Sequence, residues 1–105
     1  GAWEALSLAT RQGARALHLS DRVGTITVGK AADLSVISLE GWSAQPGDDP
    51  ASKIVYGCTA GDVRHVFVAG RPVVVAGELQ TVDEPGLRSR VEQAWRATRA
   101  RMNPT

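Results

Sequence analysis

Apolar positions recur every three or four residues over the first 19 residues, and this spacing predicts an amphipathic helix. Its stripe consists of Trp3, Leu6, Thr10, Gly13 and Leu17. Thr10 and Gly13 make the middle of the stripe thin, so a neighbouring element can approach the helix closely there. The pattern predicts a helix that packs through one face.

Two alternating segments follow this helix. Ile26 and Val28 alternate with threonines between two glycines, which predicts a short strand over residues 25–28. Residues 33–39 carry apolar side chains on both faces of an extended chain, which predicts a central strand. Asp33 stands where that strand begins, and we interpret it as a carboxylate that binds backbone amides rather than as a catalytic group.

Residues 40–53 are rich in Gly, Pro and Asp and are predicted to form a loop that leads into a short helix. Asp49 before Pro50 fits a helix N-cap followed by proline in the first turn. Residues 50–57 are then helical, and Ile54, Val55 and Tyr56 are expected to insert into the core. Asp48 points away from its neighbour Asp49 in an extended chain, which argues against an acid/base pair.

The stretch from Asp62 to Leu79 has the pattern of a hairpin. Two apolar alternations flank a turn at residues 69–71, and a second turn signal follows at Ala76 and Gly77. His65 belongs to the first alternation and is interpreted as an ordinary strand residue. We expect residues 33–39 and 64–77 to pair in one antiparallel or mixed sheet, with helices at both ends of the chain packed outside it.

The last segment, residues 83–105, predicts a second amphipathic helix. Asp83 is its N-cap candidate and Pro85 lies in its first turn. One face carries Leu87, Val91, Ala94, Trp95, Thr98 and Met102. Five arginines cover the rest, but no recognition motif or interleaved aromatic accompanies them, so we interpret them as a solvated face rather than a nucleic-acid contact.

Composition narrows the class of protein. The 105 residues, 43% hydrophobic and 22% charged, are typical of one soluble domain with one core. A net charge of +1 gives no general attraction to nucleic acid or to an anionic membrane. Residues 72–76 form the longest apolar run, which is too short to span a membrane, and the N-terminus has no pattern of a targeting segment. We therefore expect a cytoplasmic protein.

Residues that usually carry chemistry are scarce. Cys58 is the single cysteine and is expected to be a small, half-buried residue, because no histidine lies near it in sequence. His18 and His65 are far apart and match no metal-ligand spacing. We therefore assign no catalytic, metal-binding or substrate-binding residue to this chain, and no cofactor.

Two long segments nevertheless resemble one family. The segment "ALSLATRQGARALHLSDRVGTITVGKAADLSVISL" is similar to the pattern "ATxxGAxALGL" followed by "GxIxxGKxADLxV", found near the C-terminus of amidohydrolase-superfamily enzymes. The segment "DPASKIVYGCTAGDVRHVFVAGRPVVVAGELQTVD" continues the resemblance to the branch that contains triazine chlorohydrolases and deaminases of adenosine-, guanine- and cytosine-type compounds. His18 departs from the pattern, which commonly has glycine there.

The resemblance implies an α+β fold in three parts. Residues 1–19 would be the last helix of a (β/α)₈ barrel, residues 20–82 the C-terminal portion of a small β-sandwich built from both ends of the polypeptide, and residues 83–105 a C-terminal helix. The metal-binding and catalytic motifs of the family precede this helix, so none transfers to a residue here.

The resemblance also implies a function for a longer parent protein. The parent would hydrolyse a C–N or C–Cl bond of a heterocycle with water activated by Zn²⁺ or Fe²⁺, and this chain would be its non-catalytic scaffold. The implied partners are the remainder of the polypeptide and, through exposed apolar surface, a second copy in a homodimer. The alternative is a free-standing β-rich binding module without enzymatic activity, which requires a closed core of its own.

Overall fold

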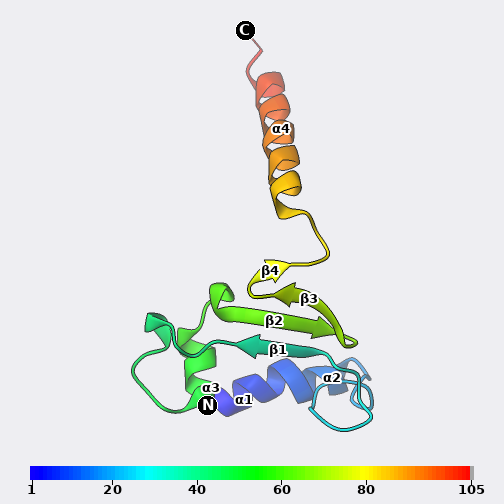
Figure 1. Ribbon diagram of the computed structural model, residues 1–105, viewed down its shortest axis with the longest axis vertical. Coiled ribbons are helices and arrows are strands. Elements are labelled where there is room, and N and C mark those ends of the chain that lie inside the picture. Colours follow the sequence, from blue (N-terminus) through cyan, green and yellow to red (C-terminus); the bar gives the residue numbers. More distant parts are fainter. Residues whose placement is uncertain (105) are drawn as a thin grey trace.

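The computed structural model describes residues 1–104 and shows an α+β fold in which a sheet lies between two helical segments (Figure 1). The N-terminal helical segment runs through α1 (Ala2–Ser7), a π-helical turn (Leu8–Gln12) and α2 (Gly13–Ala16). It lies alongside strand β1, whereas α4 (Glu84–Met102) projects from the opposite end of the molecule.

The sheet contains four strands in the order β1-β2-β3-β4, and all neighbours are antiparallel. The strands are β1 (Leu34–Ile37), β2 (Val63–Val68), β3 (Arg71–Val75) and β4 (Glu78–Leu79). The predicted pairing of the segments around residues 33–39 and 64–77 is therefore confirmed.

Both turns of the predicted hairpin region are confirmed as two-residue turns. Ala69 and Gly70 have φ of 51° and 76°, and Ala76 and Gly77 have φ of 49° and 80°. Two successive residues with positive φ are the requirement of a type I′ turn, whose twist matches that of the flanking strands. An Ala-Gly sequence therefore forms each turn at the expense of one strained alanine.

Two strand predictions are wrong. Residues 25–28 form no strand, and Ile26 and Val28 are almost completely exposed at 91% and 104%. Strand β1 lies at the edge of the sheet and not at its centre. The reason is the same in both cases: an alternating segment becomes a strand, or a central strand, only where another strand pairs with it, and none of residues 1–104 does so at these edges.

The N-terminal helix is confirmed, but its buried residues are Ala2 and Ala14 rather than the large members of the predicted stripe. Trp3 and Leu17 remain 63% and 70% exposed. The helix ends at His18, which takes the left-handed conformation with φ of 57°. Glycine is the residue that adopts this conformation without strain, which explains why the similar family pattern commonly has glycine at this position.

Helix α3 (Pro50–Ser52) and the π-helical turn that continues it (Lys53–Gly57) confirm the predicted short helix. Asp49 is its N-cap and accepts a hydrogen bond from the Ser52 amide at 3.0 Å. The expected insertion of the following side chains is only partly correct. Ile54 and Val55 are half-buried, but Tyr56 is 77% exposed because it lies on the outer side of the turn.

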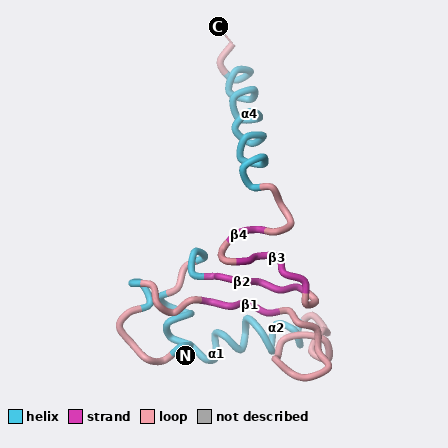
Figure 2. Tube along the Cα trace, in the orientation of Figure 1, coloured by secondary structure: helices cyan, strands magenta, loops and turns pink. Residues whose placement is uncertain are grey.

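Helix α4 begins at the predicted N-cap, where Asp83 accepts the Gly86 amide at 3.3 Å, and Pro85 lies in its first turn. Its expected packing against the sheet is wrong. The linker after β4 carries the helix away from the sheet (Figure 2), and no residue of α4 is buried. No helix among residues 1–104 is long and apolar enough to cross a membrane.

The described residues do not form the single core that composition predicts. The buried hydrophobic residues are Ala2, Ala14, Ala44 and Ala51. The chain exposes 8383 Å², whereas a compact monomer of this size exposes about 5,700 Å². The radius of gyration is 18.8 Å, against about 13 Å for a compact domain of this length. The helices and the sheet therefore leave much of their apolar surface without a cover.

Candidate functional site

The side chains that could act as catalytic groups or metal ligands do not lie close to one another in this structure. Among residues 1–104, no three His, Cys, Asp or Glu side chains are placed to hold a metal ion. His18 is exposed, and His65 accepts the Ala76 amide on its Nδ1 at 3.2 Å. The Cys58 thiol is half-buried, as expected, and donates to the Ser38 carbonyl at 3.6 Å. Each of these groups has a local structural contact or faces solvent.

Asp33 and Asp49, the carboxylates singled out in the sequence, both bind backbone amides. Asp33 Oδ1 accepts the Ala69 amide at 2.7 Å and so ties the start of β1 to the β2–β3 turn. Hydrogen bonds from the Ser52 hydroxyl and amide hold the pKa of Asp49 below its usual value. A carboxylate whose ionised form is stabilised in this way is a poor proton donor or acceptor near neutral pH, which favours a structural role for Asp49. The hydrogen bond of Asp33 to the β2–β3 turn gives that residue a structural role as well.

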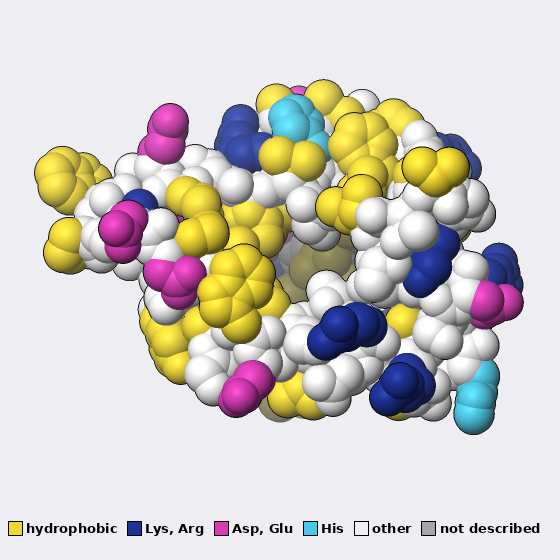
Figure 3. Space-filling view, turned by 90° about the horizontal axis from the view of Figure 1, so that it is seen from below, with side chains coloured by type: hydrophobic (Ala, Val, Ile, Leu, Met, Phe, Trp, Pro, Cys, Tyr) yellow, Lys and Arg dark blue, Asp and Glu magenta, His cyan; other side chains and the backbone are white. Residues whose placement is uncertain are grey.

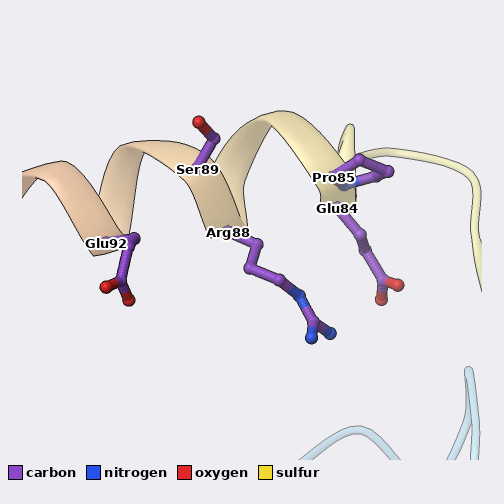
Figure 4. A pocket seen from close by; sticks show the side chains of 5 residues that line it. All are labelled: Glu84, Pro85, Arg88, Ser89 and Glu92. Carbon is purple, nitrogen blue, oxygen red and sulfur yellow. The ribbon is translucent and has the colours of Figure 1, made fainter.

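A depression along α4 is formed by one helix only. Its residues are Glu84, Pro85, Arg88, Ser89 and Glu92, and Figure 4 shows them along successive turns with Glu84, Arg88 and Glu92 directed to one side. A ligand site needs groups that converge from several directions. This surface is therefore the bare side of a helix.

A largely apolar hollow lies between the N-terminal helix and β1, and we call it the β1 hollow. Its volume is about 640 Å³. The lining residues are Ala9, Thr10, Gly13, Ala14, Leu17, Leu19, Val23, Gly24, Thr25, Ile26, Asp33, Leu34, Ser35 and Ile37. Figure 3 views the molecule from the side of this helix and shows a depression bordered by hydrophobic side chains.

The edge of β1 that faces the β1 hollow has no strand partner among residues 1–104. On its other edge, the Ala32 carbonyl accepts the Gly70 amide at 2.9 Å and the Ser38 amide donates to Asp62 at 2.8 Å. Backbone groups alternate in direction along a strand, so those of Ser35 and Ile37 point into the hollow. The arrangement can therefore accept an extended segment that pairs with β1 and places apolar side chains against the helix.

One pattern in the sequence indicates the β1 hollow, although it was interpreted above as two strands. Apolar residues on both faces of residues 33–39 indicate a strand with neighbours on all sides, and Ile26 and Val28 indicate extended apolar chain next to it. Ile26, Leu34 and Ile37 line the hollow but do not fill it. The two strand predictions were wrong because residues 1–104 provide no strand that pairs with this edge of β1.

Comparisons with known proteins find sequence relatives of this chain. A model of the amidohydrolase family matches residues 2–73. A 5-methylthioadenosine/S-adenosylhomocysteine deaminase of Halalkalibacterium halodurans is 42% identical over 84 residues, which are 80% of this chain and 19% of that protein. A 5'-deoxyadenosine deaminase of Methanopyrus kandleri is 42% identical over 81 residues, 77% of this chain and 19% of that protein.

Solved structures with the same arrangement include a zinc-bound adenosine deaminase from Xanthomonas campestris. It has a TM-score of 0.84 and 38% identity, and the match covers 98% of this chain and 23% of that one. A zinc complex of an atrazine chlorohydrolase from Arthrobacter aurescens has a TM-score of 0.76 and 28% identity over 89% of this chain and 20% of that one. The chain spans about one fifth of the length of the relatives that it matches.

Proposed function

Because the chain belongs to the amidohydrolase family, we propose that it is the C-terminal scaffold of a metal-dependent hydrolase that removes ammonia from an adenosine-type compound. The relatives named above are deaminases of 5-methylthioadenosine, S-adenosylhomocysteine and 5'-deoxyadenosine. Their identity to this chain exceeds that of the chlorohydrolase. Cleavage of a C–N bond is therefore favoured over cleavage of a C–Cl bond.

The β1 hollow is the single observation that best supports a scaffold role. It presents apolar side chains from the helix and an unpaired edge of β1 to the same space. A strand from the remainder of the polypeptide would satisfy the backbone groups of β1 and bury this surface. Residues 20–82 would then be one half of a β-sandwich, residues 1–19 a helix against the barrel, and residues 83–105 a separate C-terminal helix.

The metal of such an enzyme belongs elsewhere in the polypeptide. The donor groups of residues 1–104 do not fit a metal site, because no three of them come together. The zinc-bound neighbours support a metal ion in the whole protein, and the family resemblance implies that this ion is Zn²⁺ or Fe²⁺. Such an ion lowers the pKa of a bound water and so generates hydroxide near neutral pH. The contribution of this chain is to hold the parts that bind the ion in place.

The alternative of a free-standing binding module is less well supported. Such a module needs a core of its own, and among residues 1–104 the buried hydrophobic side chains are those of four alanines. Burial of large apolar side chains supplies most of the stability of a small domain. The exposed apolar surface is better explained as surface that other parts of a larger protein cover.

Expression of the 105-residue chain together with the polypeptide encoded upstream of Gly1 tests the proposal. We expect the upstream part to carry an HxH motif and to release ammonia from 5'-methylthioadenosine only when this chain is present, whereas this chain alone has no activity. Ammonia release is measured with each part alone and with both. Equal activity of the upstream part with and without this chain, or activity of this chain alone, would contradict the scaffold role.

A further inference from the structure

One face of α4 carries an apolar ridge that lies outside the β1 hollow. The ridge consists of Leu87, Val91, Trp95 and Met102, which are 45%, 60%, 55% and 71% exposed. At 100° and 1.5 Å per residue, these positions fall within an arc of about 80° and extend over about 22 Å of the helix. A contiguous apolar surface of this kind marks a contact with another part of a protein, whereas single exposed apolar residues need no explanation.

The described residues do not hold α4 in place. The linker after β4 leads away from the sheet, and no residue of the helix is buried. Its side-chain hydrogen bonds close within the helix, from Thr98 to the Ala94 carbonyl at 2.9 Å and from Arg96 to Glu92 at 3.2 Å. An isolated helix of 19 residues is only marginally stable in water, because most helical stability comes from packing of the apolar face. The cover of the ridge therefore lies outside residues 1–104.

A helix with this placement occurs in a much longer protein. The match to the adenosine deaminase from Xanthomonas campestris covers 98% of this chain, so it includes α4, and its TM-score is 0.84. The same match covers only 23% of the longer chain. The greater part of a polypeptide of that length is therefore available to cover the ridge, and the ridge needs no second copy of this chain.

The charges beside the ridge indicate what kind of surface covers it. At 100° per residue, two arginines lie along each flank of the ridge: Arg88 and Arg99 on one side, Arg90 and Arg101 on the other. None of these four arginines forms an ion pair within residues 1–104. An arginine side chain binds a carboxylate through two parallel hydrogen bonds. The pattern therefore fits a groove with an apolar floor and carboxylates on both rims.

We propose that α4 docks through its ridge on such a groove in the remainder of the polypeptide. Trp95 is the anchor of this contact, because it is the bulkiest member of the ridge and lies between Val91 and Met102. Large aromatic side chains at the centre of a contact, accompanied by arginines, are typical of stable protein interfaces. This inference rests on the scaffold role proposed above but on no particular substrate.

The docked helix gives the chain a second attachment to the remainder of the polypeptide. The β1 hollow lies beside the N-terminal helix, whereas α4 projects from the opposite end of a molecule that is 59 Å along its longest axis. Two contacts joined by one chain strengthen each other, because the second contact forms within a molecule that is already bound. Loss of the ridge contact should therefore free α4 without releasing the rest of the chain.

Amide hydrogen exchange of the whole polypeptide, in which this chain continues its upstream part, tests the proposal. In the ridge variant, Val91→Ala with Trp95→Ala, the amides of α4 should exchange about thirtyfold faster than in the wild type. Truncation of two interface side chains costs about 2 kcal/mol, which corresponds to this factor. Alanine is the best helix former, so faster exchange cannot result from lower helix propensity. The matched control, Ser89→Ala with Gln93→Ala on the opposite side of α4, should stay within about twofold of the wild type.

A second pair of variants tests the carboxylates at the rims. In Arg90→Gln with Arg101→Gln, the amides of α4 should exchange about fivefold faster, because two exposed ion pairs contribute about 0.5 kcal/mol each. Arg96→Gln removes an arginine from the back of the helix and should have at most about a twofold effect, from its pair within α4. Equal exchange in these two variants would overturn the carboxylate rims.

Three results would overturn the docked helix itself. The first is exchange of the α4 amides in the wild type as fast as in an unstructured peptide, and the second is equal exchange in the ridge variant and its control. The third is exchange that slows with protein concentration, which would indicate that a second copy covers the ridge. The amides of Ser35 and Ile37, which point into the β1 hollow, separate this failure from that of the scaffold role. If they exchange slowly while α4 exchanges fast, only the docked helix is wrong; if both exchange fast, the scaffold role fails as well.

Discussion

Replacement of His18 by glycine should make the chain more stable. His18 has φ of 57°, a left-handed conformation that is unfavourable for any residue with a Cβ atom. Two hydrogen bonds require it: Leu19 donates to the Ala14 carbonyl at 2.8 Å, and His18 donates to the Arg15 carbonyl at 3.0 Å. These are the two bonds of a Schellman motif, in which glycine is the preferred residue.

The expected gain follows from two opposing terms. Relief of the left-handed strain contributes about 1–2 kcal/mol, and the greater freedom of glycine in the unfolded chain costs about 0.5–1 kcal/mol. His18 is exposed, so little packing is lost with its side chain. The free energy of unfolding should therefore rise by about 0.5–1 kcal/mol in His18→Gly.

Urea unfolding followed by circular dichroism measures this change. The control is His18→Ala, which removes the imidazole but keeps the Cβ atom, and it should leave the free energy of unfolding within about 0.5 kcal/mol of the wild type. If His18→Gly were no more stable than His18→Ala, the left-handed strain would not be the reason for the departure from the family pattern, and the reasoning would be refuted.

Three further changes test local features of the fold by urea unfolding. Gly24→Ala should destabilise by about 2–4 kcal/mol, because φ is 100° and the new Cβ would lie 2.6 Å from a side chain of α2, whereas Gly29→Ala, with φ of 93° and open space, should lose only the strain. Asp33→Ala should destabilise by about 1 kcal/mol, because the amide of the β2–β3 turn loses its acceptor; Asp33→Asn, which keeps an acceptor oxygen, should lose less, and an equal loss would contradict this account. The pKa of Asp49 in the folded chain is lowered from its ordinary value of 3.8. The ionised Asp49 therefore stabilises the folded chain fully above pH 3.8, and this stabilisation is lost as the pH falls through the lower folded pKa. The difference in the free energy of unfolding between the wild type and Asp49→Ala should shrink on acidification, and a constant difference would mean that the ionised form is not the one that caps α3.

The parts of the fold that depend on neighbours in sequence could be predicted. Asp49 and Asp83 were identified as N-caps because each precedes a proline and a helical pattern, and both cap as expected. The two Ala-Gly turns were predicted because each interrupts an alternation of apolar residues with a glycine, the residue that adopts positive φ most readily. Hydrogen bonds of this kind close within a few residues, so a single sequence contains all the atoms that decide them.

The parts that depend on distant partners could not be predicted. The position of β1 at the sheet edge and the exposure of Trp3 follow from which elements are present to cover them, and a pattern of apolar residues does not state its partner. The same limit explains the exposure of α4. Its apolar face predicts burial, but the sequence does not indicate which surface covers it. The β1 hollow was missed for this reason, although each of its walls was recognised as apolar.

One cause accounts for most of these departures. Residues 25–28 alternate as a strand does, yet Ile26 and Val28 face solvent; β1 has the composition of a central strand, yet one of its edges has no partner in the described residues. Both would be correct predictions if a further strand occupied the β1 hollow, since that strand would pair with β1 and cover Ile26. The exposed apolar residues would then be parts of a larger core than this chain contains. This reasoning supports the scaffold role independently of the family resemblance, because it rests on the mismatch between pattern and burial.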